Sequence, residues 1–199
     1  MAMRLVFLWM AAVFLSVFIF NYLEAGIKIG STEPPRFEVG DEWIFIDRRN
    51  TSEISLKMIK EQGDIYVFEE TTKIGSGQIN YDSQLNRIGG DKKLDFPLYP
   101  GKKWSWRKWS RAALVKADFE VLAEETHRVP AGVFKALKIR AVIDAYFLGL
   151  KHSWRGTIFY WYARCAGNII DVAPDFKSSE IIPMSLKSYK FQNAPNECG

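Results

Sequence analysis

The 199-residue chain contains only two cysteines and two histidines. So few thiols exclude a disulfide-dense scaffold, and the same scarcity argues against an all-protein structural zinc site. The sequence also lacks the G-x-S-x-G, Walker and H-E-x-x-H motifs of common hydrolases, nucleotide-binding proteins and metalloproteases. From Phe37 onward, no stretch has a clear apolar period of about 3.6 residues. These absences favour a non-helical domain without a metal or cofactor, and a binding or structural role over catalysis.

Apolar side chains are plentiful, at 48% of residues, and aromatic side chains make up 15%. With 25% charged residues, this composition is typical of a globular chain with a substantial core. The formal net charge of +4 favours anionic surfaces, such as lipid headgroups or cell-wall polymers, over acidic proteins. Solubility alone explains that charge equally well. The chain has no block of lysine and arginine, so nucleic acid is not an expected partner.

The N-terminus resembles a secretory signal, because Arg4 precedes an almost unbroken apolar run over residues 5–20 and a small residue, Ala25, follows it. Residues 1–25 are therefore predicted to form a hydrophobic helix that is either a cleaved signal peptide or an uncleaved membrane anchor. A helix buried within the fold is the third interpretation, although the run has no polar face. Arg4 lies on the N-terminal side of the run and no Lys or Arg follows the run before Lys28, so the remaining chain is expected outside the cytoplasm. The periplasm or the outer face of the cytoplasmic membrane is the predicted location.

The rest of the chain is predicted to be an all-β domain, over residues 36–192, between a linker (26–35) and a C-terminal tail (193–199). Alternation of apolar and polar residues with a period of two recurs between turn signals. The expected strands are residues 43–46, 54–59, 65–68, 115–124, 133–147 and 154–163. Residues 129–132, Val-Pro-Ala-Gly, are expected to form the turn of a hairpin between 115–124 and 133–147. Glycine-rich segments at 75–77 and 89–91 are expected to mark two further short strands. Because the strand at 154–163 is apolar on both faces, we expect it either to be central in a sandwich or to line a cavity.

One sequence pattern occurs twice. Gly40, Trp43 and Phe45 share the spacing Gly-x-x-Trp-x-aromatic with Gly101, Trp104 and Trp106, 61 positions later. The glycine suits a turn, and aromatic residues two apart share one face of a strand. The repetition predicts two β-meanders that begin in the same way, with chance similarity as the alternative.

Two segments resemble exported bacterial β-sheet domains of unknown function, a group sometimes labelled TapB-like. Residues 129–139 resemble the V-x-A-G-x-F-x-A-x-x-I hairpin of those domains, and residues 161–169 resemble their W-Y-A-x-x-x-G-x-V strand and turn. The chain departs from the second pattern at residues 164–166. The resemblance implies an antiparallel sheet curved into a sandwich or half-barrel, in a bacterial envelope, and it brings no catalytic residues.

His127 and His152 each lie beside a predicted turn, where either could act as a general base if a nucleophile folded against it. Solvated turn histidines are the alternative interpretation. The two cysteines, Cys165 and Cys198, are predicted to form a disulfide in an oxidising compartment. Two free thiols, or a bridge from Cys198 to a partner chain, are the alternatives.

The segment 102–111 is the most suggestive for binding. In a strand, Trp104 and Trp106 share one face. The opposite face carries basic side chains and an indole, those of Lys103, Arg107, Arg111 and Trp109. Cations interleaved with an indole suit an anionic headgroup, a sugar acid or a membrane interface. The alternative is that the two tryptophans fill the core and that the basic face is only solvated.

The predicted function is that of an exported bacterial envelope protein, a non-enzymatic binding module for an apolar or anionic envelope ligand or a protein partner. Its sheet could hold an acyl chain on a concave, aromatic face. The candidate ligand-binding residues are Trp104, Trp106, Arg107, Arg111, Trp154, Tyr160 and Tyr162. A structural component of an envelope assembly is one alternative, and a hydrolase using His127 or His152 is another.

Overall fold

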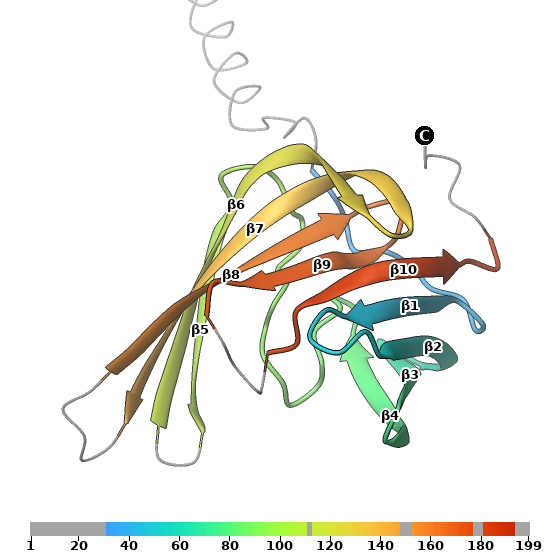
Figure 1. The fold of residues 1–199 in the computed structure, drawn as a ribbon, viewed down its shortest axis with the longest axis horizontal. Helices are drawn as coiled ribbons and strands as arrows, with labels where there is room; N and C mark the ends of the chain where they lie inside the picture. Colours follow the sequence, from blue (N-terminus) through green and yellow to red (C-terminus); the bar gives the residue numbers. More distant parts are fainter. Residues whose placement is uncertain (1–30, 111–112, 148–152, 177–180, 194–199) are drawn as a thin grey trace, which may run out of the picture. The chain divides into compact units, whose positions relative to one another are not determined.

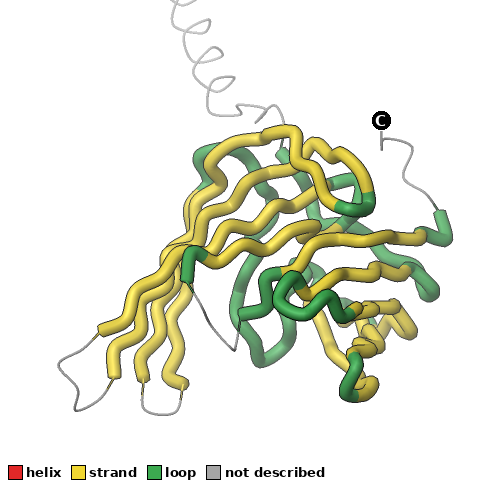
Figure 2. Tube along the Cα trace, viewed as in Figure 1, coloured by secondary structure: helices red, strands yellow, loops and turns green. Residues whose placement is uncertain are grey.

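The computed structural model describes residues 31–110, 113–147, 153–176 and 181–193, and everything below concerns these residues. Figure 2 shows strands and loops and no helix among them. The hydrophobic helix predicted for residues 1–25 lies outside the described residues. The described part of the chain also offers no helix long and apolar enough to cross a membrane.

Ten strands account for most of the described chain. They are β1 (Glu42–Asp47), β2 (Glu53–Gln62), β3 (Ile65–Thr72), β4 (Gly75–Asp82), β5 (Lys103–Ser110), β6 (Ala113–Val129), β7 (Gly132–Phe147), β8 (Ser153–Ala163), β9 (Asn168–Pro174) and β10 (Met184–Lys190). All six strands expected from alternation are present, several of them longer than predicted. The short strand expected near residues 89–91 is absent: residues 83–102, which connect β4 to β5, form loops and turns.

The strands form a single antiparallel sheet in the order β4-β3-β2-β1-β10-β9-β8-β7-β6-β5 (Figure 1). Strands β1–β4 make one meander and β5–β9 make a second, and β10 lies between β1 and β9. The two strands of the repeated sequence pattern, β1 and β5, therefore open the two meanders as predicted. Gly40 and Gly101, which precede them, both have positive φ, at 103° and 87°. Glycine is suited to that conformation because it has no Cβ.

The predicted sandwich or half-barrel is not what the sheet forms, since the structure has one open, uncurled sheet whose end strands β4 and β5 do not pair. The apolar face of β6–β9 is covered by the connection between β4 and β5 and not by a second sheet. Leu94, Phe96 and Leu98 of the β4–β5 connection bury against one face of β6–β9. Asn86 holds that connection in place, because its side chain donates to the carbonyl of Leu94 and accepts from its N–H, both at 2.9 Å.

The β6–β7 hairpin is the longest pairing, and it turns at Pro130 and Ala131 as the sequence predicted. A β-bulge between Val121 and Ala123 interrupts its register. Ala123 is consequently exposed, although strict alternation placed it on the buried face with Val121. At the tip, the N–H of Ala131 donates to the carbonyl of Leu186 in β10 at 3.0 Å. The hairpin tip thereby covers part of the sheet.

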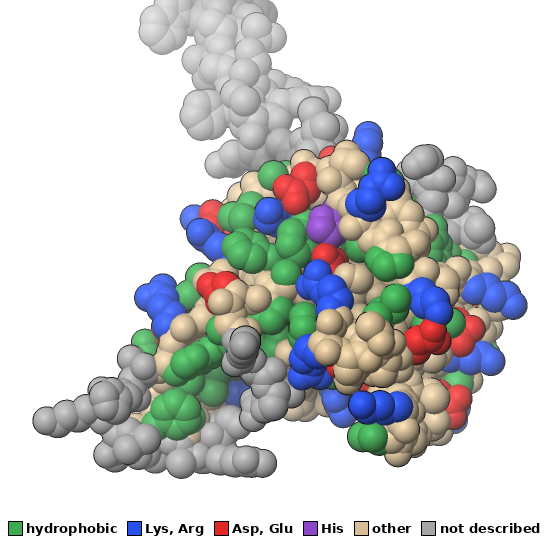
Figure 3. Space-filling model, in the orientation of Figure 1, with side chains coloured by type: hydrophobic (Ala, Val, Ile, Leu, Met, Phe, Trp, Pro, Cys, Tyr) green, Lys and Arg blue, Asp and Glu red, His purple; other side chains and the backbone are tan. Residues whose placement is uncertain are grey.

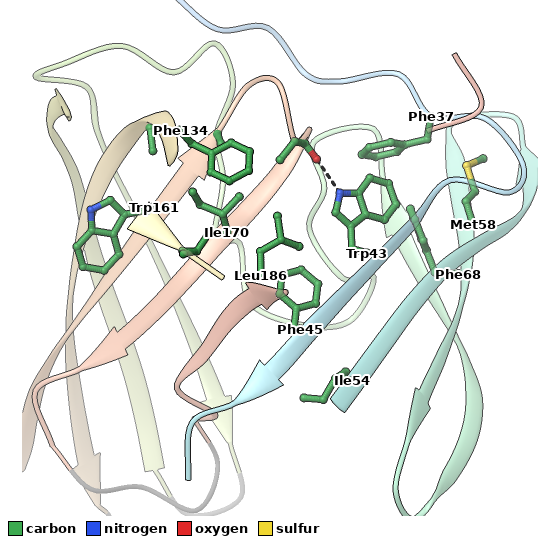
Figure 4. Close-up of a cluster of buried hydrophobic side chains, with 14 of the residues drawn as sticks. Phe37, Trp43, Phe45, Ile54, Met58, Phe68, Phe134, Trp161, Ile170 and Leu186 are labelled. Carbon is green, nitrogen blue, oxygen red and sulfur yellow. Dashed lines mark hydrogen bonds between the residues drawn. The ribbon is translucent and has the colours of Figure 1, made fainter. Parts of the chain in front are cut away.

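The first of two hydrophobic clusters is centred on Trp43, which is fully buried (Figure 4). Phe37 and Phe191 meet the Trp43 ring edge-on, with centroids 5.1 and 5.5 Å away. The indole Nε1 donates to the carbonyl of Ala166 in the β8–β9 turn at 2.6 Å. Trp43 therefore ties the start of β1 to a turn 123 positions later. The second cluster lies between β6–β9 and the β4–β5 connection.

Candidate functional site

The ends of β5–β8 extend away from the rest of the sheet, at the lower left of Figure 1. We call residues 106–110, 113–117, 143–147 and 153–156 the distal end. Its strands pair without a register shift, so each cross-strand row points to one face and the next row to the other. Trp109, Leu114 and Tyr146 lie in one such row. Lys108, Val115, Ala145 and Trp154 form the adjacent row, on the opposite face.

Large aromatic side chains are exposed on both faces of the distal end. The exposed fractions are 62% for Trp109, 49% for Tyr146, 42% for Phe147 and 37% for Trp154. Figure 3 shows hydrophobic side chains gathered over this part of the molecule. Single exposed apolar residues are ordinary on a protein surface, but a group of them on one projecting element indicates an interaction site.

Basic side chains share a face with Trp109 and Tyr146. Two rows away from Trp109 and Tyr146 lies a row of mostly basic side chains, and rows two apart point to the same face. This row contains Arg107, Lys116, Asp144 and Arg155. Lys116 pairs with Asp118 at 2.6 Å, and the Arg155–Asp144 pair is loose at 3.6 Å. Arg107 forms no ion pair with any residue in the described ranges. The surface beside the exposed indole is therefore cationic.

On the opposite face, Trp104 and Trp106 lie side by side as predicted, away from Lys103, Arg107 and Trp109. The Trp104 ring stacks on Phe119 with centroids 5.1 Å apart and planes 6° apart. Lys108 Nζ lies 5.4 Å from the Trp106 ring centroid. Both indoles are half-buried, and their buried Nε1 atoms have no hydrogen-bond partner in the part of the chain that the structure describes. The two tryptophans therefore contribute to the core while reaching the distal end.

Trp154 is anchored by an aromatic contact on the same face. Its ring meets Phe176 edge-on, with centroids 4.5 Å apart. Phe176 lies over Gly156, where a Cβ atom would stand 2.4 Å from the Phe176 ring. Glycine at this position therefore allows the two rings to pack, and the anchored indole keeps 37% of its surface exposed.

Tyr160 and Tyr162 share the face of Trp154 but lie in the core, with 5% and 1% of their surface exposed. Phe96 meets Tyr162 edge-on at 5.3 Å, so the β4–β5 connection fills the space next to it. Burial raises the pKa of both phenols, which keeps them neutral. The structure thus brings the predicted aromatic residues to one face, exposed at the distal end and covered further along β8.

Three of the residues proposed from sequence, Arg111, His152 and Cys198, lie outside the described residues. Cys165 is half-buried in the β8–β9 turn, and its disulfide with Cys198 stays a prediction. Tyr146 and Phe147 were missed as candidate residues. Their signal was two adjacent aromatics at the very end of a strand, where neither face is covered.

A polar cluster away from the distal end surrounds His127 on β6. Its Nε2 lies 2.8 Å from Oδ2 of the buried Asp171, and its ring stacks on Trp161 with centroids 4.3 Å apart. Ser185 donates to the other oxygen of Asp171 at 2.6 Å. The carboxylate therefore stands between histidine and serine, whereas a Ser–His–Asp relay places the imidazole in the middle. This arrangement fastens β6, β9 and β10 together and differs from that of a catalytic triad.

Across the described ranges, no three His, Cys, Asp or Glu side chains gather in a way that could hold a metal ion.

Comparison with known proteins finds no matching family model and no matching curated protein. A crystal structure of a candidate exported protein with a YmcC-like fold from Bacteroides fragilis is similar, with a TM-score of 0.51 and 17% identity, over 80% of this chain and 99% of that chain. The match shows a shared fold. A candidate lipoprotein from Parabacteroides distasonis gives a TM-score of 0.49 and 14% identity over the same shares. The more specific resemblance to TapB-like domains stays a prediction.

Proposed function

We propose that this chain is an exported bacterial envelope protein that binds an anionic lipid surface through the distal end of β5–β8. The observation that carries the proposal is the exposure of four aromatic side chains on one projecting part of the sheet, two of them, Trp109 and Tyr146, on the face that carries the basic row. Trp and Tyr favour the membrane interface because the ring is apolar while its N–H or O–H stays hydrated. Arginine and lysine beside them attract anionic headgroups.

Export is supported by the sequence and by the fold. The basic start and apolar run of residues 1–20 have the pattern of a secretory signal or anchor. The Bacteroides fragilis protein with the shared fold is itself described as a candidate exported protein. An envelope location would bring the distal end within reach of membrane lipid.

The experiment compares binding of the full chain, purified as the cell exports it, to phosphatidylglycerol and phosphatidylcholine vesicles by cosedimentation. The N-terminus is the same in every variant, so its contribution cancels. We expect tighter binding to phosphatidylglycerol. Arg107→Glu should weaken that binding about tenfold, since it removes one favourable charge near the surface and adds a repulsive one.

Trp109→Ala tests the aromatic contribution, and Ile74→Ala is its matched control. Both side chains are exposed, at 62% and 90%, but Ile74 lies in the β3–β4 turn, away from the basic rows. We expect Trp109→Ala to weaken vesicle binding and Ile74→Ala to leave it unchanged. Equal binding to both lipids by wild-type protein, or equal loss in both variants, would overturn the proposal. A stable protein partner whose binding depends on Trp109 would favour the envelope-assembly alternative instead.

A further inference from the structure

The two edges of the sheet differ in how far the chain itself covers them. At the β4 edge, the N–H of Ile88 donates to the carbonyl of Asn80 at 2.8 Å, and the N–H of Asp82 donates to the carbonyl of Asn86 at 3.0 Å. Residues 86–88 therefore cap the end of β4. At the β5 edge, no backbone group of the described residues hydrogen-bonds to the outer side of the strand. An unpaired strand edge of this kind is a template for another strand.

The hydrogen bonds at the start of β5 show which of its backbone groups face outward. The N–H of Val121 in β6 donates to the carbonyl of Lys102 at 2.9 Å, which fixes the register of the bonded pairs. Bonded and non-bonded pairs alternate along an antiparallel ladder, and β5 pairs with β6 over its whole length without a register shift. The N–H and C=O groups that point away from β6 therefore belong to Lys103, Ser105, Arg107 and Trp109.

The two faces of β5 differ in chemistry, and an added strand would extend both. Side chains directly opposite one another on paired strands lie on the same face of the sheet. The basic Lys103 and Arg107 flank the exposed Ser105 on one face, whereas the half-buried Trp104 and Trp106 lie on the other. An added strand with acidic side chains on the first face and apolar side chains on the second would match both.

The basic side chains also disfavour a second copy of this chain as the added strand. Antiparallel pairing of two β5 strands centred on Ser105 would place Lys103 of each copy opposite Arg107 of the other, and like charges directly opposite one another destabilise a pair. Glu120 lies 3.2 Å from Lys103 but is shared with Arg140, and Arg107 forms no ion pair with any described residue. The charge of this edge therefore complements an acidic strand.

We propose that the outer edge of β5 binds an extended acidic segment of a partner protein as an added antiparallel strand. Acidic residues of the segment lie opposite Lys103 and Arg107, and its alternate apolar residues lie against Trp104 and Trp106. Antiparallel pairing continues the pattern of the sheet, in which every strand pair is antiparallel. Main-chain hydrogen bonds supply the affinity, and the alternating side chains supply the specificity. This surface goes beyond the lipid-binding proposal, because residues 103–105 lie outside the distal end.

The test uses the peptide Val-Glu-Val-Glu-Val-Glu-Val, labelled with fluorescein and titrated with the full chain by fluorescence polarisation. We expect saturable binding of this peptide and about tenfold weaker binding of Val-Lys-Val-Lys-Val-Lys-Val, whose charges face Lys103 and Arg107. The acidic peptide N-methylated at its glutamates should not bind, because those N–H groups face β5 in an antiparallel pair. The protein is unchanged in this comparison, so the result does not depend on the folding of a variant.

Ser105→Pro blocks the edge from the protein side. A sheet accepts proline at an edge position whose N–H faces solvent, so the sheet should still form, and circular dichroism checks that it does. Ser105→Ala is the matched control, because it keeps the outward N–H. We expect Ser105→Pro to abolish binding of the acidic peptide and Ser105→Ala to leave it unchanged.

No saturable binding by wild-type protein, equal binding of the acidic and basic peptides, or undiminished binding of the N-methylated peptide would overturn the proposal. A dimer in sedimentation that Ser105→Pro abolishes would overturn it as well, since a second copy would then occupy the edge. Binding to phosphatidylglycerol vesicles should be equal in Ser105→Pro and wild type. Lipid binding and strand addition can therefore fail separately.

Discussion

His127 on β6 and Asp171 on β9 lie 44 positions apart, yet their side chains meet at 2.8 Å between Nε2 and Oδ2. The same carboxylate accepts from Ser185 on β10 and lies 3.5 Å from the Arg48 guanidinium. A buried acceptor with several donors from different strands holds those strands in fixed positions. The cluster around Asp171 therefore fastens the long hairpin to the middle of the sheet.

Replacing His127 by alanine should reduce the free energy of unfolding by about 1–3 kcal/mol, because a buried carboxylate loses a donor and Trp161 loses a stacked ring. Urea denaturation of the full chain measures the loss. Thr126→Ala, at an exposed neighbour on the same strand, is the control. A loss no larger than that of the control would show that the His127–Asp171 contact adds nothing.

Acid should weaken the protein partly through Asp47 at the end of β1. Hydrogen bonds from Arg49 lower the pKa of this buried carboxyl below its ordinary value of 3.8. A lowered pKa in the folded state means that the stabilisation is present above the ordinary value and is lost as the pH falls through the folded-state pKa. Asp47→Asn should therefore flatten the loss of stability below about pH 4. Urea midpoints measured across that range test this, with Asp64→Asn in the exposed β2–β3 turn as control. Parallel curves for Asp47→Asn and wild type would contradict it.

Trp43→Phe should cost about 2–4 kcal/mol. The change leaves a void in the first cluster and deprives the Ala166 carbonyl of its donor. Trp109→Phe makes the same chemical change at an exposed position and should cost little. Denaturation of the two variants side by side gives the comparison, and similar costs would mean that the buried hydrogen bond is not important.

Gly156→Ala should displace Phe176, because the new methyl group would stand 2.4 Å from its ring and 2.8 Å from Trp154. The Trp154 indole would lose its edge-on contact and become more hydrated, so tryptophan emission should shift to longer wavelength. Gly77→Ala on β4 is the control, since its Cβ would meet nothing within 4 Å. An unchanged emission spectrum in Gly156→Ala would show that Phe176 does not fix this indole.

The sequence predicted the strands that alternate strictly and turn on proline or glycine. The hairpin around Pro130 and Gly132 and the common start of the two meanders are confirmed. It did not predict β10, whose short run Met184–Lys190 has exposed residues mixed with buried ones. Nor did it show that a connection without strands would cover the face of β8, because long-range packing of Leu94 and Phe96 leaves no local pattern.

The candidate site was also predicted only in part, because alternation shows which face a side chain takes but not whether that face is covered. Alternation placed Trp104 on the other face of β5 from Arg107 and Trp109, since the face that a side chain takes depends only on the local period of two. Exposure depends on what the rest of the chain covers. Tyr160 and Tyr162 looked equivalent to Trp154 in sequence, but only Trp154 reaches beyond the covering connection. The His127–Asp171 contact spans 44 positions and had no sequence signal.

The position of β10 has a consequence for how the protein is made. Among the described residues, β10 is the strand that joins the two meanders into one sheet, and it follows the other nine in the sequence. Until residues 184–190 emerge, β1 and β9 each present an unpaired edge, which is open to non-native pairing. Completion of the sheet must therefore await β10, and a nascent chain stalled before that point would need protection from its neighbours.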